Sequence, residues 1–259
     1  MNIWILALVI WALSALAMTG VWSFAMRTRN IGYVDVAWAG LMSLAALVAG
    51  VFSSGAALPR LLTAAAGAVW GARLCVHLLR RVLREEEDGR YQVLRQRWNG
   101  SPTKFFVFFQ VQALVVALFA LPFLAAASSP VEQVTFWTIA AIAVWVAAVG
   151  GESVADAQLA AFREVAGNAG KTCRAGFWGW SRHPNYFFEW LHWFAYVLLA
   201  VGSPHALLAW LGPVVMLVFL YRVSGIPWTE QQALRSRGED YRLYQQEVSA
   251  FFPRPPRRS

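Results

Sequence analysis

Long apolar runs, separated by short polar segments, dominate this sequence. The first run, residues 3–26, contains no charged residue, and two arginines follow it closely. A helix needs about 20 mostly apolar residues to cross a bilayer. Further runs that meet or approach this length lie at residues 31–52, 61–79, 105–127, 134–150, 186–201 and 206–221. The pattern predicts an all-α, polytopic membrane helix bundle of about seven transmembrane helices, with about six as the alternative because the last runs are short.

Arginine and lysine gather in alternate connections between these runs. The segments after the first, third and fifth runs and the C-terminal tail are basic, whereas residues 53–60, 126–133 and 202–205 contain only Arg60. Because basic loops resist translocation, we expect the N-terminus outside and the C-terminus in the cytoplasm. The net charge of +8 is then explained by loops that face anionic lipid. Membrane lipid, and no nucleic acid, is the expected partner.

The composition excludes an ordinary soluble domain. Hydrophobic residues make up 58% of the chain and charged residues 14%, whereas soluble domains are about 25% charged. No internal repeat and no Pro- or Ser-rich linker divides the sequence, so we expect one integral membrane domain over residues 1–259. Two cysteines, Cys75 and Cys173, are too few to form a metal-ligand set alone, and no metal is expected. The oligomeric state is left open.

Ionisable residues inside the predicted spans are candidates for chemistry. A charged side chain near the centre of a membrane helix costs about 2.5 to 3.5 kcal/mol, so each one needs a partner, a cavity or a function. Asp35 lies early in the second run, with Trp38 one turn further on the same face. In the third run, Arg73, His77 and Arg80 recur at helical spacing on one face. Asp35 either pairs with Arg73 as a structural bridge or serves a functional site inside the bundle.

A second group of polar residues begins in the fifth run. Glu152, Asp156 and Arg163 are separated by four and seven residues, which places them on one helical face that continues past the membrane edge. A polar, glycine-rich segment follows over residues 164–180. The sequence therefore predicts a functional face at the cytoplasmic end of this helix, with a solvated membrane rim as the simpler alternative.

The next apolar run opens with a motif of mixed chemistry, residues 181–189. Pro184 suits the first turn of a helix, whose free N–H groups would lie near Arg174 and Arg182. Such an arrangement can bind an anion. Asn185 and Glu189 share the next turn of the same helix.

The C-terminal segment reads as an amphipathic helix. Residues 225–227, Gly-Ile-Pro, interrupt the last apolar run, and an amphipathic stretch follows over residues 228–250. It carries Glu230, and Tyr241 and Tyr244 stand one turn apart. The pattern favours an interfacial helix anchored by aromatic and arginine side chains at least as much as a binding role.

Four motifs together resemble one family. They are Val34-Asp35-Val36-Ala37-Trp38, Glu87-Asp88-Gly89-Arg90-Tyr91-Gln92, Ser181-Arg182-His183-Pro184-Asn185-Tyr186 and Phe251-Phe252-Pro253-Arg254. This pattern resembles the uncharacterised bacterial branch, of the DUF1295 type, of the steroid 5α-reductase-like membrane proteins. The resemblance covers nearly the whole chain and implies a multi-pass protein of the bacterial inner (cell) membrane. It also implies an NADPH site built from cytoplasmic loops and helix ends, for which the candidates are Glu152, Asp156, Arg163, Arg174, Arg182, Asn185, Glu189, Glu230 and Tyr241.

The chemistry that this resemblance implies is reduction of a carbon–carbon double bond conjugated to a ketone, in a lipophilic steroid-like or isoprenoid-like molecule. Related enzymes polarise the ketone with a glutamate on the second helix and a tyrosine on the third. Here the carboxylate is Asp35, and a buried carboxyl can stay protonated to act as an acid. The tyrosine position holds Leu78 instead. His77 or Tyr33 is the candidate for the missing tyrosine's part.

Two other functions compete with reduction. Membrane methyltransferases of the isoprenylcysteine carboxyl methyltransferase type carry a loosely similar Arg-His-Pro-Asn-Tyr motif and bind S-adenosylmethionine. The arginines favour NADPH, whose 2′-phosphate and pyrophosphate reward Arg163, Arg174 and Arg182, whereas S-adenosylmethionine has no phosphate. A lipid-binding protein without catalysis is the third possibility, and the missing tyrosine favours it.

Overall fold

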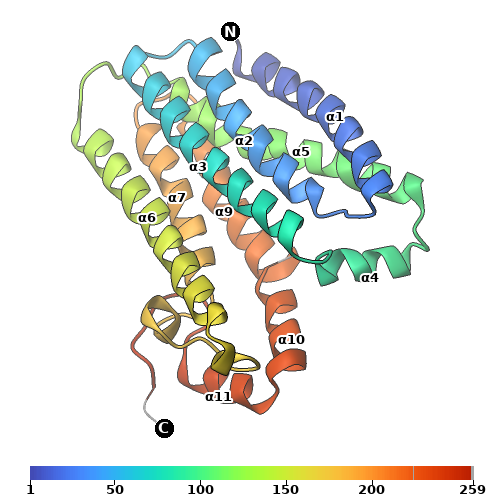
Figure 1. Ribbon diagram of the computed structural model, residues 1–259. Helices are drawn as coiled ribbons and strands as arrows, with labels where there is room; N and C mark the ends of the chain where they lie inside the picture. Colours follow the sequence, from blue (N-terminus) through green and yellow to red (C-terminus); the bar gives the residue numbers. More distant parts are fainter. Residues whose placement is uncertain (224, 258–259) are drawn as a thin grey trace. The chain divides into compact units, whose positions relative to one another are not determined.

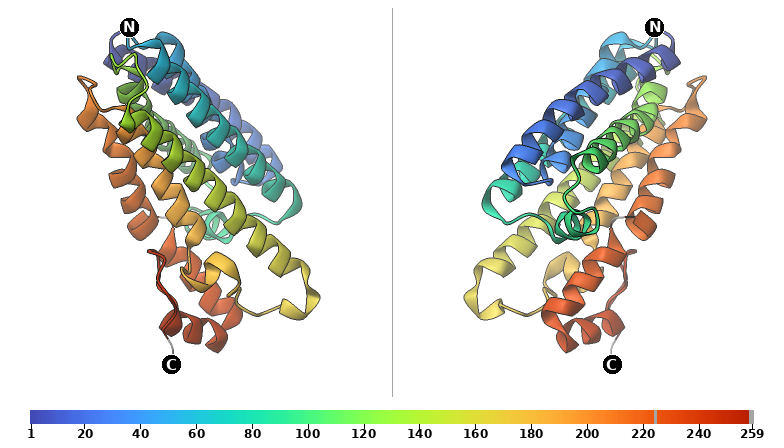
Figure 2. Two further views of the ribbon diagram at one scale, coloured as in Figure 1. Left: turned by 90° about the vertical axis from the view of Figure 1, so that its left-hand side faces the viewer. Right: turned by 90° about the vertical axis from the view of Figure 1, so that its right-hand side faces the viewer.

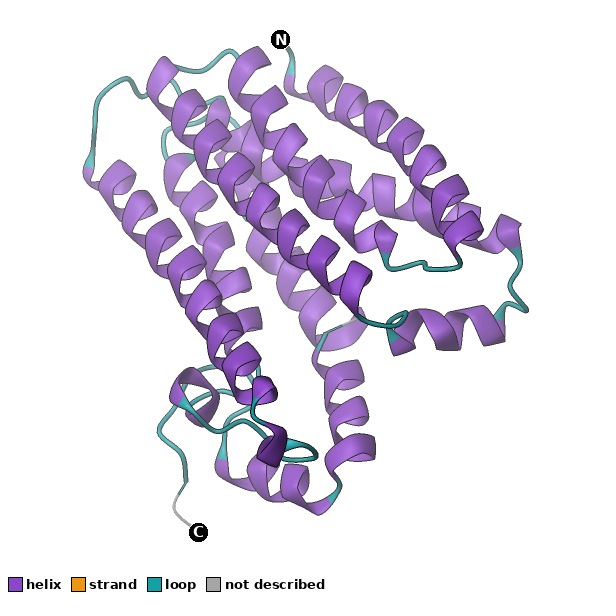
Figure 3. Cartoon of the chain, viewed as in Figure 1, coloured by secondary structure: helices purple, strands orange, loops and turns teal. Residues whose placement is uncertain are grey.

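A computed structural model describes residues 1–223 and 225–257 of the chain. Within these residues all regular structure is helical, which confirms the predicted all-α bundle (Figures 1 and 3). The α-helices are α1 (Ile3–Thr28), α2 (Tyr33–Phe52), α3 (Ala57–Arg84), α4 (Gly89–Arg97), α5 (Pro102–Ala127), α6 (Phe136–Glu164), α7 (Pro184–Leu199), α8 (Ala206–Ala209), α9 (Leu211–Val218), α10 (Ile226–Arg237) and α11 (Glu239–Glu247). Short helical turns occur at η1 (Ala166–Asn168), η2 (Gly176–Gly179) and η3 (Phe219–Val223), the last of them a π-helix.

In the described part of the chain, six helical segments are long and apolar enough to cross a membrane, so the protein is a multi-pass membrane protein. Five of them are α1, α2, α3, α5 and α6, and the sixth is the segment Ala206–Arg237, which includes residue 224 outside the described part. The expected span at residues 186–201 is α7, which has 16 residues. At 1.5 Å per residue α7 is about 24 Å long, shorter than the hydrocarbon core of a typical bilayer. The six candidate spans among the described residues therefore agree with the alternative expectation of about six transmembrane helices.

The chain divides into two compact units, described separately here. The N-terminal unit comprises Met1–Ile139 and Tyr196–Gly212. In it α2 packs against α3 and α5, and α1 packs against α5, a pairing that the right view of Figure 2 shows. Small residues permit the close α2–α3 approach: a Cβ on Gly71 would lie 2.7 Å from the backbone nitrogen of Ser43. Larger side chains at this contact would force the two helices apart.

An aromatic and aliphatic core holds the ends of α1, α2, α4 and α5 together. Phe105 and Phe109 of α5 are fully buried there, together with Ile31 and Val34 at the start of α2. Tyr91 of α4 belongs to the same core. The short helix α4 was not among the predicted elements, because its polar sequence lies within what reads as a basic loop. This packing fixes α4 next to the first turn of α2.

The second unit comprises Ala140–Ala195 and Pro213–Ser259. Its C-terminal segment is hydrogen-bonded along the loop before α7: Arg182 N donates to Ser249 O (2.9 Å), and Arg254 N donates to Trp180 O (3.0 Å). Ser181 Oγ donates to Phe251 O over 2.8 Å. The expected single amphipathic helix over residues 228–250 is two helices, because Gly238 between α10 and α11 adopts a positive φ of 55° that interrupts the helix. The single-domain expectation stays a prediction.

Candidate functional site

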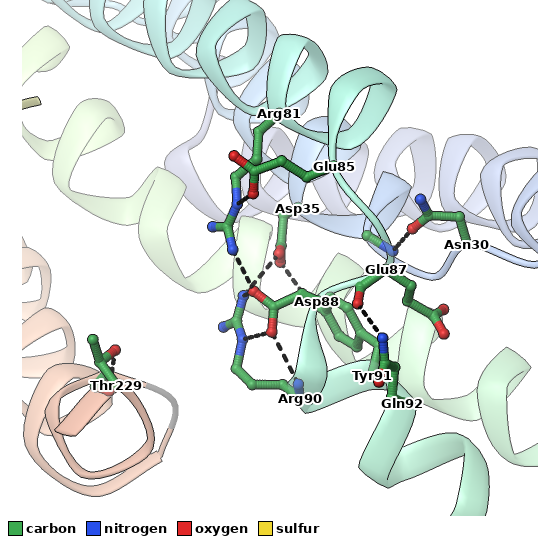
Figure 4. Close-up of polar contacts among 12 residues, drawn as sticks. Asn30, Asp35, Arg81, Glu85, Glu87, Asp88, Arg90, Tyr91, Gln92 and Thr229 are labelled. Atoms are coloured by element: carbon green, nitrogen blue, oxygen red, sulfur yellow. Dashed lines mark hydrogen bonds and ion pairs between the residues drawn. The ribbon is translucent and has the colours of Figure 1, made fainter. Parts of the chain in front are cut away.

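Asp35 lies in the first turn of α2 and makes both of its hydrogen bonds with α4 (Figure 4). Its Oδ1 accepts from the Tyr91 hydroxyl over 2.7 Å, and its Oδ2 accepts from Arg90 Nη2 over 3.2 Å. A carboxylate in the first turn is also favoured by the helix dipole. Both carboxylate oxygens therefore accept hydrogen bonds from consecutive residues of α4.

Asp88 places Arg90 and connects it to α3. It is the N-cap residue of α4 and accepts from the backbone N–H of Arg90 over 2.9 Å. Its carboxylate also contacts Arg90 Nε (3.1 Å) and Arg81 Nη2 (2.8 Å). Burial by itself raises the pKa of Asp88, but Arg90 and Arg81 outweigh it and hold that pKa below its usual value. The residues Asp35, Arg90, Tyr91, Asp88 and Arg81 form one charge-balanced network, called the Asp35 cluster below (Figure 4).

Glu87 fixes the other side of α4. It accepts from the backbone N–H of Ile31 over 2.8 Å and pairs with Arg95 Nη2 over 2.7 Å. Arg95 in turn donates to the carbonyl of Arg29 over 3.0 Å. The segment before α4 is thereby attached to the connection between α1 and α2. Contacts of Glu87 on one side of α4 and of Asp35 on the other therefore hold Tyr91 in place.

Tyr91 is the buried hydroxyl of the Asp35 cluster. Only 4% of it is exposed, its ring packs edge-on against Phe108, and the Arg90 guanidinium lies 5.3 Å from its ring centroid. Burial raises the pKa of Tyr91 well above its usual value, and the neighbouring charge of Asp35 raises it further. At neutral pH this phenol keeps its proton and acts as a hydrogen-bond donor.

The structure corrects the partner expected for Asp35. The ion pair is with Arg90, and the suggested bridge to Arg73 is wrong, because α4 provides the partners of both carboxylate oxygens. Tyr33 packs edge-on against Phe24 of α1 at 4.9 Å between ring centroids, and His77 is an exposed residue of α3. Neither contacts the Asp35 carboxylate, whose partners are both on α4. Their catalytic roles stay predictions.

Arg90 and Tyr91 received no role from the sequence, although their motif was recognised. They lie 55 and 56 residues beyond Asp35, and no spacing rule connects positions so far apart. One local signal was present. Asp88 followed by Gly89 is an N-cap pattern that predicts a short helix in the basic loop.

In the second unit, Arg182 and Glu230 form a buried ion pair at the start of the motif before α7. Arg182 Nε donates to Glu230 Oε1 over 2.7 Å, and their side chains are 11% and 16% exposed. Arg182 Nη1 also donates to the carbonyls of Gln245 (3.0 Å) and Val248 (2.7 Å). Both residues were expected to bind cofactor; here they bind each other and join the α7 motif to α10 and the end of α11.

His183 lies against this ion pair. It is 3% exposed, its ring stacks on Tyr186 with centroids 5.3 Å apart, and its Nε2 lies 3.2 Å from Glu230 Oε1. Burial lowers the pKa of His183 below its usual value, and the contact with Glu230 offsets only part of that effect. The imidazole is therefore neutral at pH 7. The other oxygen of Glu230 accepts a hydrogen bond from Gln245 Nε2 over 2.9 Å.

Arg174 lies at the rim of this unit. It pairs with Asp240 (Nη1–Oδ1 3.0 Å) and with Glu247 (3.5 Å), and its guanidinium covers the ring of Tyr244. Asp240 also accepts from the backbone N–H of Thr172 over 2.7 Å. The Arg174 side chain remains 38% exposed. Part of the Arg174 guanidinium is therefore accessible to a ligand, whereas the Arg182 guanidinium is largely buried.

Asp156 and Asn185, predicted to share one site, are joined by a hydrogen bond. Asn185 Nδ2 donates to Asp156 Oδ1 over 3.2 Å, linking α6 to the first turn of α7. Glu152 is buried one turn before Asp156 on α6, and Arg163 is exposed at the end of that helix. Glu189 is half-buried on α7, and Tyr241 is buried on α11. The cofactor roles of these residues stay predictions.

The fold and its polar clusters define a multi-pass helical membrane protein with ionisable networks at helix ends. A family model described as "Protein of unknown function (DUF1295)" matches residues 21–248, and the chain belongs to this family. A relative in fission yeast, Schizosaccharomyces pombe, described as "Uncharacterized protein C594.04c", is 27% identical over 265 positions, which cover 90% of this chain and 75% of the relative. No solved structure matches the chain significantly.

Proposed function

We propose that this protein is a membrane-embedded, NADPH-dependent reductase of a conjugated enone in a lipophilic molecule. The observation that carries the proposal is the Tyr91 hydroxyl, a buried donor held 2.7 Å from the Asp35 carboxylate at the end of an apolar helix. Reduction of an enone requires a group that stabilises negative charge on the ketone oxygen as hydride reaches the β-carbon. A protonated phenol supplies this hydrogen bond.

The residues of the Asp35 cluster have distinct parts in this proposal. Tyr91 donates its hydrogen bond to the ketone oxygen when that oxygen replaces Asp35 as the acceptor. Asp35 positions the phenol beforehand, and Arg90 balances the Asp35 charge throughout. This assignment differs from the expected protonated Asp35 acid, because both Asp35 oxygens are acceptors in the structure.

NADPH supplies the hydride when it is bound. The residues of the second unit fit this cofactor in part: the Asp156–Asn185 pair offers an acceptor and an amide for ribose or base, and the exposed Arg163 and Arg174 offer charge for phosphate. Arg182 does not fit a phosphate role, since Glu230 and two carbonyls already engage it. The proposal therefore assigns the phosphates to Arg163 and Arg174.

The engagement of Arg182 favours one second candidate. Two of the three arginines that separate NADPH from S-adenosylmethionine are already paired with carboxylates, Arg182 with Glu230 and Arg174 with Asp240 and Glu247, so transfer of a methyl group from S-adenosylmethionine competes with reduction. Purified protein decides between them. Loss of NADPH absorbance at 340 nm on addition of an enone supports the reductase, whereas thermal stabilisation by S-adenosylmethionine and by neither nicotinamide cofactor overturns it.

A further inference from the structure

The indole nitrogen of Trp38 is a buried donor without an acceptor. Among residues 1–223 and 225–257, no oxygen or nitrogen accepts a hydrogen bond from Trp38 Nε1, although the atom is shielded from solvent. Two other indoles in the described part of the chain have acceptors. Trp22 Nε1 donates to the carbonyl of Pro102 over 3.1 Å, and Trp178 Nε1 donates to the carbonyl of Ala155 over 2.9 Å. Trp38 Nε1 differs in this respect from the indole nitrogens of Trp22 and Trp178.

An unsatisfied buried N–H is costly, and such a group in a native protein requires a physical reason. The cost persists inside a bilayer, where no bulk water is present to accept the hydrogen bond. An apolar side chain of similar size would fill the same space on α2 without it. The donor is thus retained at the expense of stability, which is typical of a group that meets its acceptor only when a ligand is bound.

The ring of Trp38 is held in a fixed orientation by α3 and α5. It makes edge-to-face contacts with Trp70 of α3 (centroids 6.3 Å apart, 88°) and with Phe119 of α5 (5.7 Å, 89°). Aromatic pairs in this geometry are attractive and directional. The N–H therefore points in one direction before any ligand arrives, which reduces the entropy lost on binding.

The position of Trp38 relates it to the Asp35 cluster. Trp38 follows Asp35 by three residues on α2, so the two side chains are neighbours on one face of the helix. The indole is partly exposed and packs with apolar residues of the N-terminal core. A ligand that uses both groups is mainly apolar and carries oxygen.

We propose that Trp38 Nε1–H is a binding group for an oxygen of a lipophilic ligand, and that it selects ketones over hydrocarbons of the same shape. That this oxygen belongs to a ketone rests on the proposed function. The binding site itself does not depend on reduction.

The test uses two steroids that differ at one carbon, cholest-4-en-3-one and cholest-4-ene, in which a methylene group replaces the ketone. Binding to the full chain in dodecyl maltoside is measured by thermal shift and by equilibrium titration, without NADPH. Wild-type protein is expected to bind the ketone about tenfold more tightly than the hydrocarbon, the scale of one hydrogen bond to a buried donor. Trp38→Phe is expected to bind both sterols equally, while its ligand-free melting temperature stays level or rises.

Trp22→Phe is the matched control, because the same substitution there removes a donor that is satisfied by Pro102. It is expected to lower the melting temperature and to keep the ketone preference. If Trp38→Phe fails to fold, Trp38→Tyr replaces it in the test. This variant keeps an aromatic ring but places its donor, a hydroxyl group, at a different position. An unchanged ketone preference in either Trp38 variant overturns the proposal, as does a wild type without any ketone preference.

Phospholipid ester carbonyls are a different source of the same acceptor. This source is tested by adding either ester-linked or ether-linked phosphatidylcholine to the detergent solution, because the ether-linked lipid lacks the carbonyl acceptor. If Trp38→Phe loses stabilisation by the ester lipid only, the donor binds bilayer lipid and the ketone proposal is overturned. Ketone preference without NADPH-dependent turnover keeps the Trp38 site and removes the reductase.

Discussion

The Tyr91 hydroxyl of α4 lies 2.7 Å from a carboxylate oxygen of Asp35 on α2, although the two residues are 56 positions apart. The same carboxylate is ion-paired with Arg90, the residue immediately before Tyr91. Two consecutive residues of a nine-residue helix therefore satisfy one half-buried charge. The relationship makes the role of Tyr91 separable from that of Asp35 by mutation.

Tyr91→Phe removes the proposed donor and leaves the Asp35–Arg90 ion pair in place. We expect turnover of an enone to fall by about 10²-fold, the usual scale for an acid or polarising group, with NADPH affinity unchanged. Steady-state kinetics and cofactor titration on the same preparation check this. Tyr33→Phe tests the other candidate tyrosine, whose ring packs against Phe24, and should keep wild-type turnover if Tyr91 is the donor. A folded Tyr91→Phe protein with normal turnover would contradict the mechanism.

Asp35→Asn tests the positioning role of the carboxylate. The change leaves Arg90 with only Asp88 as a counter-charge, and Tyr91 with a weaker acceptor. The Asp35 and Arg90 side chains are 35% and 27% exposed, so we expect a loss of about 1 to 2 kcal/mol, less than the roughly 3 to 5 kcal/mol of a fully buried pair. Denaturant unfolding measures it. Turnover should also fall by about 10²-fold.

The Arg182–Glu230 ion pair is expected to hold the second unit together. Arg182→Ala strands a carboxylate that is 16% exposed and frees two carbonyls, so a loss of about 3 kcal/mol is expected. Arg242→Ala, from an exposed pair with Glu239, should change stability by less than about 1 kcal/mol. A double-mutant cycle with Glu230→Gln measures the coupling. If Arg182→Ala instead lowers only NADPH affinity, Arg182 belongs to the cofactor site.

His183 gives stability a dependence on pH. Burial lowers its pKa in the folded protein below the value of about 6.5 in the unfolded chain, so the unfolded state takes up the proton first. Stability is therefore full above pH 7 and declines as pH falls through about 6.5 toward the lower folded pKa. Melting temperatures from pH 7.5 to 5 should show this decline, and His183→Gln should reduce it. An equal slope in the variant would assign the effect to other groups.

Arg174→Ala tests the phosphate assignment. Arg174 is 38% exposed beside Asp240, and a charge-assisted hydrogen bond to phosphate contributes about 1.5 to 3 kcal/mol. NADPH affinity should therefore fall about tenfold or more, while NADH affinity changes little. Arg235→Ala, an exposed arginine in the last turn of α10, is the control. Equal weakening of both cofactors would remove Arg174 from phosphate recognition.

Membrane orientation follows from the asymmetry of basic residues. Reporter fusions at Ser53, Ser129 and Ser203 are expected to report an extracytoplasmic location, and fusions at Asp88 and Asn168 a cytoplasmic one. The fusion at Ser203 shows whether α7, with 16 residues, crosses the bilayer. A cytoplasmic signal at Ser129 would rule out the orientation of the first four spans.

The sequence by itself determined the long apolar helices that are able to cross a membrane. The run at residues 31–52 became α2, Tyr33–Phe52, and the run at residues 105–127 became α5, Pro102–Ala127. Lipid offers the backbone no hydrogen bonds, so a long apolar run has helix as its main solution, and its ends follow from composition.

Only the tertiary structure decided which polar groups meet. Helical spacing shows which face of its own helix carries Asp35 or Arg73, but it does not show which other helix packs against that face. The carboxylate is satisfied by α4, a helix that hydropathy does not reveal, and Arg182 is satisfied by Glu230, 48 residues later. A buried charge takes the partner that packing brings within about 3 Å, and that choice depends on contacts distributed over the whole unit.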